Sequence, residues 1–258
     1  MRNASRGFCH LTLEDSFPDR GNTTKEALLS AAERLYAERG LDAVSMREIT
    51  REAGQKNSTA LQYHFASKQI LVHAILTRRM NDVDSQRLEF LHDLELRGKL
   101  DDIRSLVAAM VEPMAVGFKS SKRGPADYWW VGFLSEVQRH PDFDLVELAK
   151  TASDLGLRRL YSLLAKHLPH VPDAILRQRY LMAMSQVVHG LAELERLRQR
   201  RRRSRRRFDF ERAIENLIDM TAGALSAPVS IEVARRLEAQ ATDRDRHQLD
   251  AAVSHGTT

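Results

Sequence analysis

The chain has 258 residues, of which 43% are apolar, and it contains 12 glycines, 7 prolines and a single cysteine. That length allows one large or two modest domains with a hydrophobic core. One cysteine excludes a disulfide framework or a cysteine-rich metal site within a single chain, which favours the reducing cytoplasm. The first residues lack the apolar stretch of a secretory signal, and no run of about eighteen uncharged apolar residues predicts a membrane span.

Charge is distributed unevenly along the chain. The net charge at neutral pH is +5, yet residues 196–207 alone hold nine arginines and no acidic residue. Residues 20–80 hold ten lysines and arginines against six acidic residues, so the remainder of the chain is net acidic. A basic N-terminal third on an acidic body is typical of a module that faces a polyanion, although many ordinary proteins share this split.

Apolar residues at helical spacing predict helices throughout, with a mobile arm at the N-terminus. The expected helices cover residues 24–39, 46–53, 57–64, a long segment from residue 68, 100–119, 127–139, 142–167, 173–198 and 208–225. We therefore expect an all-α fold, in which a helix-turn-helix domain is joined by a long helix to a C-terminal helical domain. The expected parts are an arm (1–22), the helix-turn-helix domain (23–70), a regulatory and dimerisation domain (71–227) and a polar tail (228–258).

Local signals mark where the first helices begin. Thr23 or Thr24 is expected to cap the first helix. Ser45 and Glu48 have the spacing of a capping box, which predicts the start of the second helix. Ser67 is expected to cap the long fourth helix, and within the later helix over residues 100–119, Pro113 predicts a kink.

A helix of about seven residues, a tight turn at Gly54 and a short polar helix are typical of a helix-turn-helix. Ile49, Leu61 and Phe65 are expected to point inward and fix the crossing of the two helices. At about 1.5 Å per residue the short helix is roughly 12 Å long, which fits a major groove about 12 Å wide. The plain alternative is a solvated three-helix bundle.

Several motifs in this region resemble the DNA-binding domain of TetR-family regulators, in the right order over residues 23–75. They are Thr24-Lys25-Glu26-Ala27-Leu28, Ser45-Met46-Arg47-Glu48-Ile49, Ala53-Gly54 and Leu61-Gln62-Tyr63-His64-Phe65-Ala66-Ser67-Lys68. The resemblance implies DNA phosphate contacts from Ser45, Tyr63, His64 and Lys68. It also implies base-edge contacts from Lys56, Asn57, Ser58, Thr59 and Gln62, although the chain is one residue longer between Gly54 and Phe65 than the commonest pattern.

The same resemblance implies a small-molecule effector bound among the C-terminal helices. Met and aromatic residues at helical spacing either line such a cavity or form ordinary core. The candidate ligand contacts are Met110, Met114, Phe118, Trp129, Trp130 and Phe133. No catalytic residue, metal or cofactor is expected. The pair His167 and His170 could ligate a metal, but two histidines without a nearby carboxylate or thiolate are more typical of a loop than of a metal site.

The last two expected helices are apolar almost all round, so each must be covered on two sides. A second copy of the chain is an economical source of that cover, which predicts a homodimer. We expect the interface around residues 180–191 and 210–225, including Val188 and Leu217, with His189 as a hydrogen-bonded interface residue. The arginine run between these helices is either a solvated loop, an aid to DNA binding or a contact for an acidic partner.

The main hypothesis is a homodimeric transcriptional repressor that binds a pseudo-palindromic DNA operator and is released by a small-molecule effector. The alternatives within this class are an activator and a regulator without an effector. An all-helical enzyme is a different class, but there is no H-E-x-x-H motif, glycine-rich phosphate loop or cysteine nucleophile in a structured region. A third class is a structural nucleic-acid binder that uses the arginine run alone.

Overall fold

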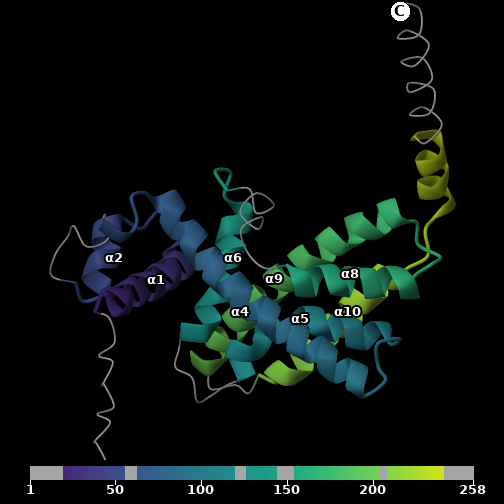
Figure 1. Cartoon of the computed structure of the whole chain (residues 1–258), viewed down its shortest axis with the longest axis horizontal. Helices are drawn as coiled ribbons and strands as arrows, with labels where there is room; N and C mark the ends of the chain where they lie inside the picture. Colours follow the sequence, from purple (N-terminus) through teal and green to yellow (C-terminus); the bar gives the residue numbers. More distant parts are fainter. Residues whose placement is uncertain (1–19, 56–62, 120–125, 144–153, 204–207, 241–258) are drawn as a thin grey trace, which may run out of the picture.

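The computed structural model describes residues 20–55, 63–119, 126–143, 154–203 and 208–240, and this part of the chain is helical with no β-strand (Figure 1). The labelled helices are α1 (Arg20–Arg39), α2 (Met46–Glu52), α4 (Lys68–Leu96), α5 (Ile103–Lys119), α6 (Ala126–Arg139), α8 (Leu155–His167), α9 (Asp173–Arg203) and α10 (Phe210–Ser226). A further helix covers Ile231–Gln240. The long helix α4 joins a small N-terminal unit to a larger C-terminal body (Figure 1), which confirms the expected all-α architecture.

The N-terminal unit consists of α1, α2 and the first turns of α4. The expected capping box is present, because the Ser45 hydroxyl accepts the N–H of Glu48 at 3.3 Å and the Glu48 carboxylate accepts the N–H of Ser45 at 2.9 Å. Ser67 caps α4 through the N–H of Ile70 at 3.2 Å, again as expected. Gly54 has a φ of +69°, a backbone conformation that glycine adopts without strain, so it makes the tight turn after α2.

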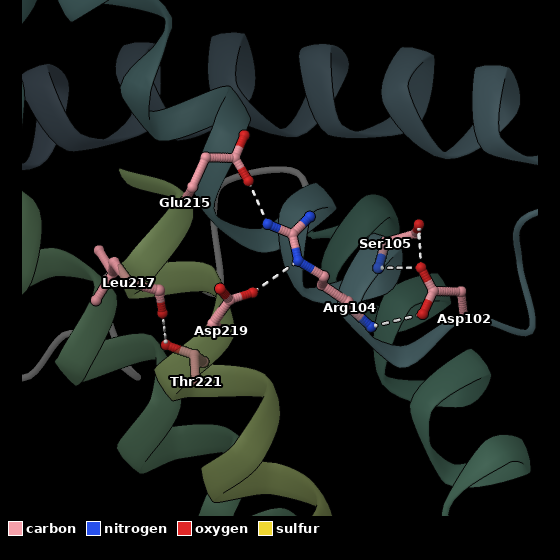
Figure 2. Close-up of polar contacts among 7 residues, drawn as sticks. All are labelled: Asp102, Arg104, Ser105, Glu215, Leu217, Asp219 and Thr221. Atoms are coloured by element: carbon pink, nitrogen blue, oxygen red, sulfur yellow. Dashed lines mark hydrogen bonds and ion pairs between the residues drawn. The ribbon is translucent and has the colours of Figure 1, made fainter. Parts of the chain in front are cut away.

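The starts of α1 and α5 differ from those expected. The helix α1 begins at Arg20, so Thr23 and Thr24 lie inside it rather than at its N-terminal cap. The helix α5 begins at Ile103 rather than at residue 100, because the Asp102 carboxylate accepts the N–H groups of Arg104 at 3.2 Å and Ser105 at 3.1 Å (Figure 2). Asp102 thus supplies the N-terminal cap, and the hydrogen bonds from Ser105 hold the pKa of its carboxyl below the usual range.

Arg104 fastens the start of α5 to α10. Its Nε donates to Asp219 at 2.7 Å and its Nη2 contacts Glu215, one turn earlier on α10 (Figure 2). Within α10 itself, the Thr221 hydroxyl donates to the Leu217 carbonyl at 2.8 Å, which satisfies a polar group that is fully buried. The expected kink-forming residue Pro113 lies inside α5.

Three expectations for the C-terminal body are corrected. The single helix expected over residues 142–167 is wrong at its start, since residues 141–143 form a turn and α8 begins only at Leu155; residues 144–153 lie outside the described part. The helix α9 extends to Arg203, so much of the arginine run is helical rather than a loop. The helix α10 begins at Phe210 because Asp209 caps it, accepting the N–H of Arg212 at 3.0 Å.

The N-terminal unit packs on the body chiefly through α1 and α6. The Tyr36 ring stacks on Phe133, with ring centroids 6.1 Å apart. A Cβ placed on Gly132 would lie 3.2 Å from the Cβ of Ala37, so the two helices approach closely at this glycine. On the other side of α1, buried Glu33 accepts hydrogen bonds from Arg78 at 3.0 Å and from Arg79 at 3.0 and 2.9 Å, which ties α1 to α4.

Within the described residues, no single helix is long and apolar enough to cross a membrane. Only α10 and the helix Ile231–Gln240 together reach the necessary length and composition, and that pair is bent by 55°.

Candidate nucleic-acid interface

Among the described residues of the N-terminal unit, Tyr63 is the most exposed large hydrophobic side chain. It is 86% exposed, whereas Phe65, two residues later, is 2% exposed and belongs to the core. The ring of His64 lies edge-on to Tyr63, with centroids 5.2 Å apart. Burial of Phe65, as expected from the sequence, fixes this short segment and leaves Tyr63 directed to solvent.

Ser45 forms the start of α2 and at the same time orders Glu48. The Ser45 hydroxyl donates to the Glu48 carboxylate at 2.8 Å, and Arg39 Nη1 donates to the same carboxylate at 3.0 Å. The backbone N–H of Ser45, followed by its hydroxyl and by Arg39, lowers the pKa of Glu48 to about 2. The cap is therefore charged at any physiological pH, and it holds the α2 N-terminus in place.

Lys68 opens α4, as expected, but it is not free in this structure. Its Nζ donates to Asp42 Oδ1 at 2.9 Å, and His140 Nε2, just after α6, lies 3.1 Å from the same oxygen. The hydrogen bonds from Lys68 and then His140 hold the pKa of the Asp42 carboxyl below its usual range. Sequence reasoning missed Asp42, because nothing in the sequence relates it to a histidine 98 positions away.

The structure brings Ser45, Tyr63, His64 and Lys68 into one small unit. The expected base-edge residues, Lys56, Asn57, Ser58, Thr59 and Gln62, lie outside the described residues. Two cations that sequence reasoning passed over, Arg47 and Arg51, are exposed one turn apart on α2. Their spacing of four residues on a helix that begins beside Ser45 is a signal that could have found them.

The expected effector contacts lie in the core of the body. Met110, Met114, Trp130 and Phe133 are each at most 4% exposed and Trp129 is half-buried, while the side chain of Phe118 lies outside the described part. Two grooves on the described part of the chain lie elsewhere. One, of about 490 Å³, lies between α9 and the helix Ile231–Gln240, and the other, of about 590 Å³, lies between α4 and α5. Trp130 Nε1 and the Tyr36 hydroxyl are buried without a hydrogen-bond partner.

The histidines considered for other roles have structural contacts. His170 Nε2 lies 3.2 Å from the carbonyl oxygen of Ser226, and His189 Nδ1 lies 2.9 Å from the Ser135 hydroxyl of α6. Across the described residues, no three His, Cys, Asp or Glu side chains are grouped to hold a metal ion.

The N-terminal unit has the features of a DNA-binding helix-turn-helix. These are a capped α2, a glycine turn, an exposed aromatic segment and a cation at the start of a supporting helix. Residues 28–75 match the family model described as bacterial regulatory proteins, tetR family, and residues 108–224 match the tetracyclin repressor-like C-terminal domain. The chain belongs to the TetR family of transcription regulators. Its class is accordingly that of a DNA-binding transcription regulator.

Solved structures support the fold. A putative TetR family regulator from Shewanella sp. PV-4 is 16% identical, with a TM-score of 0.56 over 78% of this chain and 97% of the other. A TetR family regulator from Marinobacter aquaeolei VT8 is 20% identical, with a TM-score of 0.50 over 80% of this chain and 96% of the other. No curated protein matches the chain.

Proposed function

We propose that this protein is a homodimeric transcriptional repressor that binds a pseudo-palindromic operator and is released from it by a small-molecule effector. The observation that carries the proposal is the N-terminal unit itself. It presents a fully ordered α2 cap, an 86% exposed Tyr63 and the Lys68 ammonium on one small scaffold. Groups of this kind suit a phosphate backbone, because hydroxyls and cations donate to its oxygens.

In the proposed complex, Ser45, Tyr63, His64 and Lys68 contact phosphates, and residues 56–59 with Gln62 contact base edges. Phosphate contacts fix the register of the protein on the duplex, whereas base-edge contacts select the sequence. A chromosomal operator places the protein in the cytoplasm.

The proposed dimer uses the outward faces of α9 and α10. Leu181 and Met182 on α9 are 64% and 71% exposed, and Met220 on α10 is 56% exposed. Val188 and Leu217, which the sequence placed in the interface, are 1% and 6% exposed and pack inside their own chain. Exposed apolar side chains on two adjacent helices favour cover by a second copy.

The proposed effector binds in the body near α5 and α6, where Met110, Met114, Phe118, Trp129, Trp130 and Phe133 are the candidate contacts. The orphaned Trp130 Nε1 supports this assignment, since a buried donor without a partner is costly and a ligand acceptor would satisfy it. Because α6 also packs on α1, a ligand that moves α6 would move the N-terminal unit.

Mapping the bound chromosomal DNA and comparing transcripts with and without the gene tests the proposal. A repressor predicts that transcripts next to the bound sites rise when the protein is absent. Transcripts that fall would instead make it an activator, and an absence of discrete bound sites would contradict both.

A further inference from the structure

One aspartate connects the N-terminal unit to the body. Asp42 lies in the segment between α1 and α2, and its Oδ1 contacts both Lys68 Nζ, at 2.9 Å, and His140 Nε2, at 3.1 Å. Lys68 is the first residue of α4, and His140 directly follows α6. The two donors therefore come from different parts of the molecule and share one oxygen atom.

The hydrogen bonds around the His140 ring assign its tautomer. The backbone N–H of Asp142 donates to His140 Nδ1 at 3.2 Å, and a ring nitrogen that accepts a hydrogen bond carries no hydrogen. The hydrogen is thus on Nε2, from which it is donated to Asp42. Both ring nitrogens of His140 therefore have hydrogen-bond partners.

The carboxylate is accessible to competition. The Asp42 side chain is 82% exposed, whereas Lys68 is 28% and His140 12% exposed. A DNA phosphate that approaches Lys68 competes directly with Asp42 for the ammonium group. In addition, the hydrogen bonds from Lys68 and His140 weaken one another, because both donors share the negative charge of the same oxygen atom.

We propose that Asp42 is a positioning residue. Its carboxylate competes with DNA phosphate for Lys68, and Lys68 and His140 compete with one another for its Oδ1. This inference rests on the proposed phosphate contact of Lys68. When a DNA phosphate binds Lys68, Asp42 keeps only its hydrogen bond with His140. That hydrogen bond becomes stronger and holds the end of α6 more firmly on the N-terminal unit. When the end of α6 moves away with His140, Asp42 holds Lys68 more firmly and DNA affinity falls. The coupling is reciprocal, as linkage requires.

The test measures binding of a mixed-sequence DNA duplex by fluorescence anisotropy over a range of salt concentrations, since phosphate contacts do not depend on sequence. Asp42→Asn is expected to raise the affinity about two- to fivefold, the scale of an exposed ion pair. In a Lys68→Ala background the same change is expected to have no effect. Asp101→Asn is the matched control, because it removes an equal charge from an exposed site in the turn between α4 and α5.

A second arm tests the exchange. His140→Ala is expected to lower DNA affinity in the wild-type background and to have no effect in the Asp42→Asn background. Thermal unfolding of each variant checks that the fold is kept. An Asp42→Asn affinity equal to that of Asp101→Asn would overturn the inference, as would a His140→Ala effect that persists without the Asp42 carboxylate.

The proposed phosphate contact of Lys68 and the proposed role of Asp42 would be contradicted by different results. If Lys68→Ala leaves the affinity and the salt slope unchanged, the proposed phosphate contact is wrong and the role of Asp42 falls with it. If Lys68→Ala lowers the salt slope by about 0.9, the value for one phosphate contact, and Asp42→Asn does nothing, only the role of Asp42 is wrong.

Discussion

Arg87 donates a hydrogen bond from Nε to the backbone carbonyl oxygen of Ala109, at 3.2 Å. The usual helical donor to that oxygen is missing, because Pro113, four residues later, has no N–H. Arg87 also lies 3.5 Å from Asp84, and Asp84 accepts the N–H of Gly156 at 3.0 Å. Two buried charged side chains of α4 thus satisfy backbone groups in α5 and at the start of α8, which fixes both helices on the helix that leads to the N-terminal unit.

Replacing Arg87 by Met should lower the free energy of unfolding by about 3–5 kcal/mol, because the buried Asp84 carboxylate loses the positive charge beside it. Urea unfolding followed by circular dichroism measures this change. Arg97→Met is the control, since Arg97 is 65% exposed and its pair with Asp93 should contribute at most about 0.5 kcal/mol. Equal losses for the two variants would show that the buried pair has no special role.

Pro113→Ala separates the backbone contact from the ion pair. An alanine restores the N–H that Ala109 lacks, so the Arg87→Met change should cost less in this background. The expected difference is about 0.5–3 kcal/mol, the usual range for residues that share a network. Strict additivity of the two changes would mean that the Arg87 hydrogen bond to Ala109 does not matter for stability.

The double variant Met182→Glu, Met220→Glu should be monomeric in sedimentation velocity, because it places charges on the proposed dimer face. Both side chains are exposed within the chain, so folding should be retained. Leu96→Glu is the matched control, since Leu96 is 74% exposed at the end of α4, and it should leave the dimer intact. A double variant that remains dimeric would place the interface elsewhere.

The ends of helices could be predicted from the sequence where the residues that set them are close together in the chain. The starts of α2 and α4 were predicted because Ser45 and Ser67 each bond to an N–H three residues away. The end of α9 was not, because the density of like charge suggested a loop. In the structure Arg198 lies against Glu195 and over the Phe210 ring, 5.0 Å from its centroid. Arginine is also a good helix former, so the helix continues.

In the candidate site, too, features that depend on neighbouring residues could be predicted, and contacts that depend on tertiary packing could not. Exposure of Tyr63 beside buried Phe65 follows from the local pattern of polar and apolar residues. The pairing of Lys68 with Asp42 does not, because it joins residues 26 positions apart, and the contact with His140 depends on how α6 packs against α1. The Arg87 contact with Ala109 likewise depends on tertiary packing, although Pro113 signals from the sequence alone that one carbonyl in α5 needs an outside partner.

Stability should fall as the pH drops below about 6.5, the ordinary pKa of histidine, partly because of His189. Burial, and then the charges of Arg139 and Arg196, lower the pKa of this side chain in the folded state. The unfolded chain therefore binds a proton more readily, so the contribution of His189 is complete above the unfolded pKa and is lost towards the lower, folded pKa. His189→Gln should reduce the pH dependence of the urea midpoint in this window, and an unchanged dependence would exclude His189 as a source.

In the proposed complex, the N-terminal unit reads duplex DNA as one half of a dimer. This can be tested by selecting bound sequences from a pool of random duplexes with the purified full-length protein. We expect enrichment of one pseudo-palindrome, with half-site centres about one helical turn or a multiple of it apart, and loss of that enrichment in the Tyr63→Ala, Lys68→Ala double variant. A pool with no enriched sequence, or enrichment that the double variant retains in full, would show that the N-terminal unit does not read DNA in this way.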